Sequence, residues 1–198
     1  MTIYKILEYP AVYNLSQKIL SLIAFGNKGI GNFLKEESSG NGETILDVGC
    51  GIGKYAFGLG KRYTGVDNNK EYIDYARDNY PESHFFASDS ADLNFLKEKF
   101  DNVISINTFH HLSDGQVRTT VKAMKELAVK NIYVIDPVFP PRWNLLGNLL
   151  FKLDRGQYTR SFRELDNLLV ELGFKIYRQT LKNCFPYRVC VFKFSLIS

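Results

Sequence analysis

Three glycines at alternate positions, Gly49, Gly51 and Gly53, constrain this chain more than any other feature. They follow the run Ile-Leu-Asp-Val at 45–48, which is typical of a buried parallel strand, and they precede Lys54, where we expect a helix to begin. Glycines allow a tight turn in which backbone N–H groups come close to a ligand. The dinucleotide-binding pattern G-x-G-x-x-G needs a glycine at position 54, which is lysine here. The sequence therefore predicts a ligand-binding turn of another kind.

The size and charge of the chain favour one domain that does not bind nucleic acid along a basic face. Its 198 residues are 45% hydrophobic, enough for a single α/β core and too few for two ordinary domains. The 25 basic and 21 acidic residues leave a formal charge of +4, without a long run of like charges. No apolar stretch reaches the roughly 20 residues of a membrane span. We expect a soluble, cytoplasmic protein.

The cysteines suggest neither a disulfide framework nor a metal site. Cys50, Cys184 and Cys190 are odd in number, and no two of them form a C-x-x-C pair. We expect no bound metal.

Between residues 43 and 136, strand-like apolar segments alternate with amphipathic helical ones. Such alternation implies right-handed crossovers and a parallel sheet with helices on both faces, with ligands at the carboxyl ends of the strands. Polar side chains stand at those ends: Asp67 ends the second strand, Asp89 follows the third, Asn107 ends the fourth and Asp136 the fifth. We expect strands at 45–48, 63–67, 84–87, 103–106 and 131–136, and helices at 70–79 and 114–128.

The flanking segments complete one domain of four parts. Residues 1–42 form an N-terminal helical cap and linker, with helices at 10–25 and 29–36, and residues 43–136 form the core. Residues 137–160 form a proline-rich insert after the fifth strand. In 161–198, Ser161 and Glu164 make a capping-box pattern that starts a helix, and strands at 174–180 and 188–195 follow as an antiparallel hairpin.

The order of these residues resembles the class I S-adenosylmethionine-dependent methyltransferases over about residues 44 to 136. The glycine turn, Asp67 18 residues after Gly49, Asp89 22 residues later and Asn107 18 residues after that match the family's successive motifs. The resemblance implies a doubly wound α/β fold with a seven-stranded, mostly parallel sheet of order 3-2-1-4-5-7-6 and an antiparallel strand 7. The family's Pro-Gly-Gly turn before strand 5 is absent at 127–131, where we expect a shortened loop. The signature of amino-methylating DNA enzymes is also absent, so we expect no DNA partner.

The resemblance implies S-adenosylmethionine as cofactor and S-adenosylhomocysteine as product. The amides of the glycine turn would receive the methionine part, Asp67 the two ribose hydroxyls, Asp89 with Ser90 the adenine, and Asn107 the ammonium. Taken singly, Asp67 and Asp89 also suit ordinary turns or caps, and Asp47 suits a structural role in orienting the turn. The predicted cofactor-binding residues are Asp47, Gly49, Cys50, Gly51, Gly53, Asp67, Asn68, Asp89, Ser90, Asn107 and Thr108.

Two adjacent histidines, His110 and His111, are the candidate catalytic residues. A sulfonium is an activated methyl donor, so an enzyme of this kind aligns the acceptor and excludes water, and needs a base only when the acceptor must lose a proton. The pair follows the fourth strand, and histidine suits proton transfer near neutral pH. We favour His111, with His110 behind it; in the alternative, one of the pair only caps or packs. We expect His84 to be structural.

The insert at 137–160 is expected to be a lid. Its apolar side chains would cover the site, receive an apolar acceptor, contact a membrane surface or pack on the N-terminal helix. Arginines near its end would bind a carboxylate or phosphate. The apolar residues are Trp143, Leu145, Leu146, Leu149, Leu150, Phe151 and Leu153. The predicted substrate and lid residues are Tyr9, Tyr13, Trp143, Arg155, Tyr158 and Arg160.

Together these features predict an enzyme that transfers a methyl group from S-adenosylmethionine to a small-molecule acceptor, apolar or lipid-like with an anionic group. Two alternatives stay open: an RNA-modifying methyltransferase, and a protein that binds the cofactor without catalysis. An RNA enzyme would bind RNA with strong salt dependence, and a non-catalytic protein would bind the cofactor without turnover.

Overall fold

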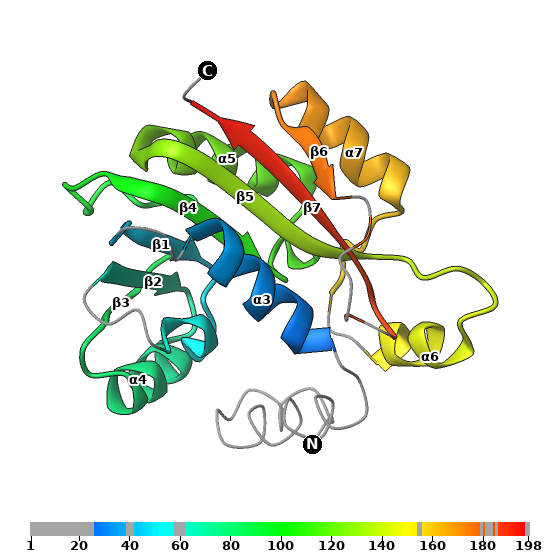
Figure 1. Cartoon of the computed structure of the whole chain (residues 1–198), viewed down its shortest axis with the longest axis horizontal. Helices are drawn as coiled ribbons and strands as arrows, with labels where there is room; N and C mark the ends of the chain where they lie inside the picture. Colours follow the sequence, from blue (N-terminus) through cyan, green and yellow to red (C-terminus); the bar gives the residue numbers. More distant parts are fainter. Residues whose placement is uncertain are drawn as a thin grey trace.

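A seven-stranded sheet of order β3-β2-β1-β4-β5-β7-β6 forms the centre of the protein (Figure 1). The computed structural model describes residues 26–38, 42–57, 62–153, 156–178, 180, 184 and 186–196. The first five strands are parallel, and β7 runs antiparallel to both β5 and β6. The predicted fold class is confirmed. The strands are β1 (Ile45–Val48), β2 (Tyr63–Asp67), β3 (His84–Ala87), β4 (Phe100–Ile106), β5 (Ala128–Val138), β6 (Lys175–Arg178) and β7 (Arg188–Ser195).

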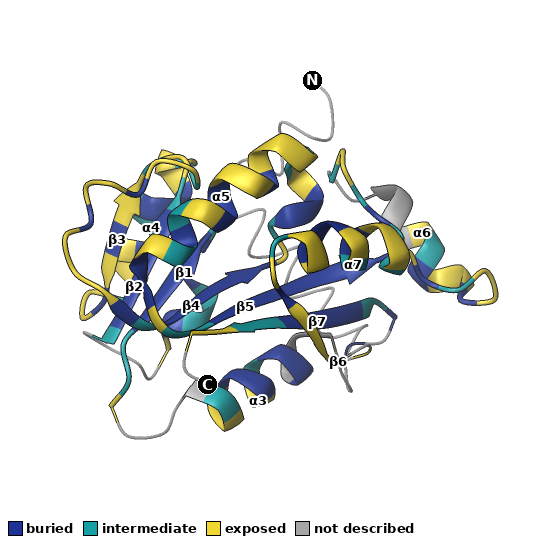
Figure 2. Cartoon of the chain, turned by 90° about the horizontal axis from the view of Figure 1, so that it is seen from above, coloured by how far each residue is buried: buried dark blue, intermediate teal, exposed yellow. Residues whose placement is uncertain are grey.

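Helices cover both faces of this sheet, and seen from above α5 and α7 lie on one side and α3 on the other (Figure 2). Two short 3-10 turns, Lys54–Ala56 and Phe109–His111, follow β1 and β4. The predicted capping box of Ser161 and Glu164 is present at the start of α7. The helices are α3 (Gly26–Ser38), α4 (Lys70–Asn79), α5 (Asp114–Leu127), α6 (Leu145–Leu153) and α7 (Phe162–Glu171). The predicted helix at 10–25, Tyr9, Tyr13 and Arg155 lie outside the described residues.

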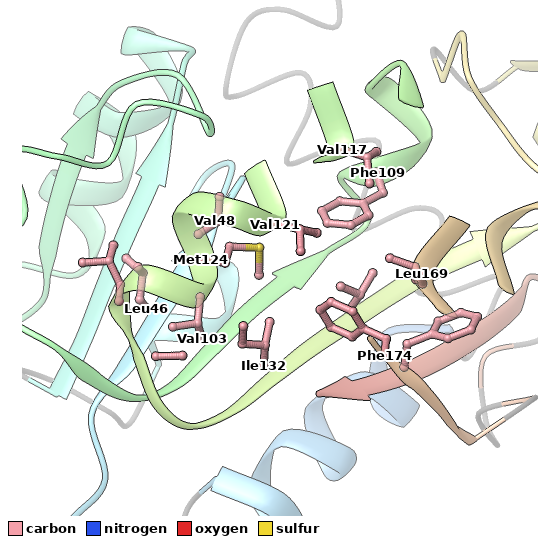
Figure 3. Packing of buried hydrophobic residues seen from close by; sticks show 14 of the residues in the cluster. Leu46, Val48, Val103, Phe109, Val117, Val121, Met124, Ile132, Leu169 and Phe174 are labelled. Carbon is pink, nitrogen blue, oxygen red and sulfur yellow. The ribbon is translucent and has the colours of Figure 1, made fainter. Parts of the chain in front are cut away.

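The core consists of two apolar clusters, one on each face of the sheet. On one face, Leu46 and Val48 of β1 belong to the same cluster as Met124 of α5 and Leu169 of α7 (Figure 3). On the other face, Ile45 packs with residues of α3 and α4. Successive side chains of a strand point to opposite faces, and both faces of this sheet are covered. All four positions of β1 are therefore buried, including the carboxyl of Asp47. The Asp47 carboxyl is therefore withdrawn from water.

The structure differs from expectation at the junction between α5 and β5. We expected a shortened loop at 127–131, but α5 ends at Leu127 and β5 begins at Ala128, so helix and strand follow without a loop. Ala128 pairs with Phe100, and a register irregularity follows between Phe100 and Asn102. Pairing therefore starts earlier than the apolar runs indicate in both strands. The last hairpin differs less: β6 ends at Arg178, before the predicted Thr180.

The described residues include neither a candidate membrane span nor a metal-binding cluster. None of their helices is both long and apolar enough to cross a bilayer. Within the same ranges, no three His, Cys, Asp or Glu side chains gather in a way that would hold a metal ion.

Candidate functional site

A cavity of about 420 Å³ lies at the carboxyl ends of β1, β2 and β4. This is the edge of the sheet at which a doubly wound fold binds ligands. Ten of the predicted site residues line it: Asp47, Gly49, Cys50, Gly51, Asp67, Asn68, Ser90, Asn107, Thr108 and His111. Among the predicted residues that the structure describes, Gly53, Asp89, His110, Trp143, Tyr158 and Arg160 do not line it.

The glycine turn needs glycine at each of its three positions, for different reasons. All three have a positive φ: 82° at Gly49, 55° at Gly51 and 71° at Gly53. A Cβ at position 49 would lie 2.3 Å from Thr108 Oγ1, and one at position 53 would lie 2.7 Å from the Phe85 ring. A Cβ at Gly51 would meet nothing within 4 Å. Two of the glycines thus serve packing, and the backbone at Gly51 faces open space.

Asp67 connects the glycine turn to the end of β2. Gly51 N donates to its Oδ2 at 2.8 Å, and Asn69 N donates to its Oδ1 at 2.9 Å. Burial raises the pKa of the Asp67 carboxyl, and these two backbone hydrogen bonds oppose the rise. A carboxylate offers about four acceptor positions, so each oxygen keeps capacity for a ligand hydroxyl.

Asp47 is the most unusual acid of the site, being only 1% exposed. The Tyr63 hydroxyl donates to its Oδ2 at 2.5 Å. Its Oδ1 has no hydrogen-bond partner among the described residues. Burial raises the pKa of the Asp47 carboxyl to about 7; the Tyr63 hydrogen bond opposes the rise and the nearby Asp67 adds to it. A buried acceptor in a cavity wall is matched by a ligand that brings a donor.

This buried acid makes the stability of the free protein depend on pH. The folded pKa of about 7 lies above the unfolded value of 3.8, so burial of this carboxyl costs nothing below pH 4, its cost grows between pH 4 and 7, and it stays constant above pH 7. The full cost is on the order of 4 kcal/mol. Asp47→Asn should therefore stabilise the protein, by about 2–3 kcal/mol more at pH 8 than at pH 5.

Urea unfolding of both proteins at the two pH values measures this difference. Tyr63→Phe is the matched control, because it removes the donor to Oδ2 and should destabilise the protein more at pH 8 than at pH 5. If the free energies of unfolding of wild type and Asp47→Asn differ by the same amount at both pH values, the raised pKa of the Asp47 carboxyl is contradicted.

The end of β4 brings Asn107 and Thr108 to the cavity. Asn107 has φ 53°, the one non-glycine positive φ among the described residues, and asparagine tolerates this conformation better than most residues. Its N–H donates to Ile135 O at 2.9 Å. The Thr108 hydroxyl donates to Gly49 O at 3.3 Å or Ile106 O at 3.1 Å. This turn and the glycine turn therefore hold each other in place.

The two histidines have different environments. His111 is exposed and lines the cavity, whereas His110 is buried, with Nδ1 3.3 Å from Asp136 Oδ1. Phe109 N also donates to this Asp136 oxygen, at 3.1 Å. The two imidazole rings lie 4.1 Å apart between centroids. His110 is thus placed to hold the turn after β4, and His111 is placed to meet a ligand.

Of the two residues predicted to bind adenine, Ser90 and Asp89, only Ser90 lines the cavity. The Ser90 hydroxyl lies 2.9 Å from that of Thr120. Asp89 is exposed outside the cavity, and its Oδ1 accepts a hydrogen bond from Ala91 N at 2.8 Å. Asp89 therefore has the environment of the ordinary turn residue that we considered as its alternative.

Arg160 does not have the geometry of a free anion-binding side chain. It is 9% exposed, and its donors bind Asp114 Oδ1 and the carbonyl oxygens of Phe109, Tyr158 and Leu112. These five hydrogen bonds match the five N–H groups of a guanidinium. Arg160 holds the insert against the turn after β4, which differs from the substrate contact that we expected.

The rest of the described insert is exposed and apolar. Trp143 is 78% exposed and Tyr158 43%. In α6, Leu145 and Leu149 are also exposed, and the Asn144 side chain donates to Pro186 O at 2.7 Å, which places the start of α6 near the start of β7. The side chains of Leu150, Phe151 and Leu153, and any contact with residues 1–25, lie outside the described part.

Sequence reasoning missed several residues of the cavity wall. Asn69 had a usable signal, because an asparagine before a predicted helix is typical of an N-cap, and its Oδ1 accepts from Tyr72 N at 3.2 Å. Others lie in or beside predicted elements, such as Ile52 in the glycine turn and Val66 in the second strand, but the sequence did not show that they face the cavity. The missed residues are Ile52, Lys54, Tyr55, Val66, Asn69, Tyr72, Ile106 and Leu112.

Curated relatives of this chain include methyltransferases of different acceptor classes. The human protein named "Probable tRNA methyltransferase 9B" is 37% identical over 97 residues, 48% of this chain and 20% of its own length. O-methyltransferase cnsE of Penicillium expansum is 28% identical over 154 residues, 70% of this chain and 54% of its own. O-methyltransferase rstn1 of Aspergillus nomiae is 30% identical over 154 residues, 70% of this chain and 67% of its own. This chain thus spans a fifth to two thirds of these relatives.

Solved structures share the fold at low identity. The TehB-like methyltransferase of Corynebacterium glutamicum superposes with a TM-score of 0.66, at 18% identity, over 92% of this chain and 96% of that one. Magnesium protoporphyrin IX methyltransferase of Synechocystis, with bound S-adenosylhomocysteine, gives 0.62 at 20% identity over 85% and 80%. Residues 45–131 match the family described as "Methyltransferase domain". With the glycine turn, the sheet order and the cavity, these matches show that the chain belongs to the class I S-adenosylmethionine-dependent methyltransferases.

Proposed function

We propose that this methyltransferase methylates an oxygen atom of a small-molecule acceptor, with His111 as general base. The observation that carries the proposal is that His111, alone of the adjacent histidines, lines the cavity at the end of β4. A hydroxyl acceptor must lose a proton as the methyl group arrives, and an imidazole near neutral pH takes such a proton readily. The cofactor supplies the activated methyl group.

The polar groups of the cavity support a site for S-adenosylmethionine. The space above Gly51 would receive the methionine part, and Asp67 would accept the ribose hydroxyls. The unpartnered Asp47 Oδ1 suits a donor such as the α-ammonium, reached directly or through water, with Asn107 on the adjoining wall. Tyr72 and Ser90 line the cavity where an adenine would lie beyond the ribose.

The backbone at Gly51 should be sensitive to any side chain. Gly51→Val places a β-branched residue at φ 55°, which such residues avoid, and fills the open space with two methyl groups. We expect a folded protein whose affinity for S-adenosylmethionine falls by about tenfold or more, measured by calorimetry. Gly115→Val is the control, because a Cβ there also meets nothing within 4 Å but lies on α5 away from the cavity. Equal affinities in wild type and Gly51→Val would show that the glycine turn does not contact the cofactor.

The extent of the alignments supports a small-molecule acceptor. The two fungal O-methyltransferases align with 70% of this chain, whereas the human tRNA enzyme aligns with 48%, about the size of the cofactor-binding core. Acceptor recognition in an enzyme of this fold depends on segments outside that core, such as the insert after β5. The exposed apolar side chains of Trp143, Leu145 and Leu149 in that insert suit an apolar acceptor.

RNA modification is the second candidate, favoured by the 37% identity to the human tRNA enzyme. One experiment separates the two. The protein is incubated with methyl-labelled S-adenosylmethionine and cell extract, and the label is followed into the RNA, protein and small-molecule fractions. We expect an ether or ester product in the small-molecule fraction, unchanged by prior nuclease treatment. Label confined to nuclease-sensitive material would overturn the proposal in favour of RNA.

A further inference from the structure

Lys54 is the one lysine or arginine among the described residues that line the cavity. It directly follows the glycine turn, at the start of the 3-10 turn Lys54–Ala56, and it is half-buried. The other partly buried lysines of the described chain have partners. Lys130 pairs with Glu43 and Asp101, and Lys125 donates to the Leu172 carbonyl. The Lys193 ammonium lies over the rings of Tyr133 and Tyr177. No described residue makes an ion pair or hydrogen bond with the Lys54 ammonium.

The acids in the same cavity have other partners. Asp67 accepts hydrogen bonds from Gly51 N and Asn69 N, and Asp47 accepts one from Tyr63. Burial lowers the pKa of the Lys54 ammonium to about 8, the direction expected for a cation withdrawn from water without a compensating anion. A ligand that brings an anion would repay this desolvation.

We propose that the Lys54 ammonium binds the carboxylate of the methionine part of the cofactor and so selects the complete amino-acid end of the ligand. The carboxylate is the one anionic group of S-adenosylmethionine, and Lys54 adjoins the glycine turn that faces the open space of the cavity. The inference rests on the cofactor site proposed above and not on the identity of the acceptor.

Two ligands that differ only in the carboxylate test this role without measuring turnover. Calorimetry with S-adenosylmethionine and with decarboxylated S-adenosylmethionine is carried out on wild type, Lys54→Met and Lys54→Arg. We expect Lys54→Met to weaken binding of the complete cofactor by about tenfold or more and to change binding of the decarboxylated form less than about twofold. Lys54→Arg, which keeps the charge, should retain most of the affinity.

Lys122→Met is the matched control, because Lys122 is exposed on α5 and does not line the cavity. Its affinities for both ligands should equal those of wild type. Equal losses for both ligands in Lys54→Met would overturn the inference, because Lys54 would then only support the turn. Unchanged affinities for both ligands would also overturn it. Failure of wild type to bind either ligand would instead refute the cofactor site on which the inference rests.

The pH dependence of binding gives an independent readout. In the free protein the Lys54 ammonium loses its proton above pH 8, so the affinity of wild type for S-adenosylhomocysteine should fall by about tenfold from pH 7 to pH 9, relative to Lys54→Arg. The other titratable groups of the cavity are the same in both proteins: Asp47 on β1, Cys50, Tyr55, Asp67 on β2, Tyr72 on α4 and His111. Parallel pH curves for the two proteins would contradict the role of Lys54.

Discussion

Asp67→Ala should weaken the binding of S-adenosylmethionine by about a hundredfold or more. A hydrogen bond to a charged group contributes about 1.5–3 kcal/mol, and the proposed contact has two, one to each ribose hydroxyl. The same substitution removes the acceptors for Gly51 N and Asn69 N, which hold the glycine turn against β2. Calorimetry on the folded variant measures the loss.

The ribose contact can be separated from the effect on the turn. Wild type should prefer S-adenosylhomocysteine over its 2′-deoxy analogue, and Asp67→Ala should lose that preference because the acceptor is gone. Asp89→Ala is the matched control: Asp89 is an exposed acid outside the cavity with one backbone contact, so its removal should change affinity less than about threefold. An Asp67→Ala protein that still discriminates between the two ligands would show that another group holds the ribose.

The difference between Asp67 and Asp89 shows what sequence patterns can predict about such a site. Asp67 ends a predicted strand and Asp89 follows one, and strand ends converge at one edge of a parallel sheet. The spacing of these acids along the chain predicts that both lie at the same edge of the sheet. The predicted strand β2 matched the structure at both ends. It does not give the direction of a side chain within a loop. Local backbone hydrogen bonds decide that direction, and they turn Asp89 back to Ala91.

The residues that sequence analysis missed or misplaced depend on tertiary contacts. Arg160 looked like a free cation near the site, but three carbonyl oxygens and Asp114, from separate parts of the chain, occupy its guanidinium. For Lys54 the sequence indicated only the start of a helix, and its position in the cavity without a partner among the described residues is visible only in the structure. Charge patterns in a sequence show how many cations exist, whereas the partners of each cation are a property of the fold.

The surroundings of His111 connect this local geometry to catalysis. His110 binds Asp136, and its carbonyl accepts from Tyr158 N at 3.0 Å, so the turn after β4 is fixed to both β5 and the insert. A Cβ on Gly156 would lie 2.4 Å from the His110 ring, so the insert approaches this turn very closely. Any movement of the insert on acceptor binding would therefore shift His110 and, through the contact between the two imidazole rings, His111. The proposed base thus belongs to a turn that contacts with β5 and the insert hold in position.

His111→Asn should lower the turnover number by about a hundredfold or more, the usual contribution of a positioned proton acceptor, once the labelled product has identified the acceptor. Its affinity for S-adenosylmethionine should stay close to that of wild type, because Asp67 and the glycine turn are untouched. The wild-type rate should fall on acidification, because a protonated imidazole cannot accept the proton of the acceptor, and the variant should lose this dependence. His84→Asn, at an exposed histidine of β3, should behave like wild type.

A different outcome would identify the acceptor atom more narrowly. An amine that is already neutral, a thiolate or an activated carbon needs no proton acceptor at the moment of transfer. An active His111→Asn enzyme with the wild-type pH profile would therefore contradict both the base and the oxygen acceptor, while the family assignment would stand on the fold and the relatives. In that case alignment would depend on the shape of the cavity wall, to which Leu112, held by Arg160 through its carbonyl oxygen, contributes.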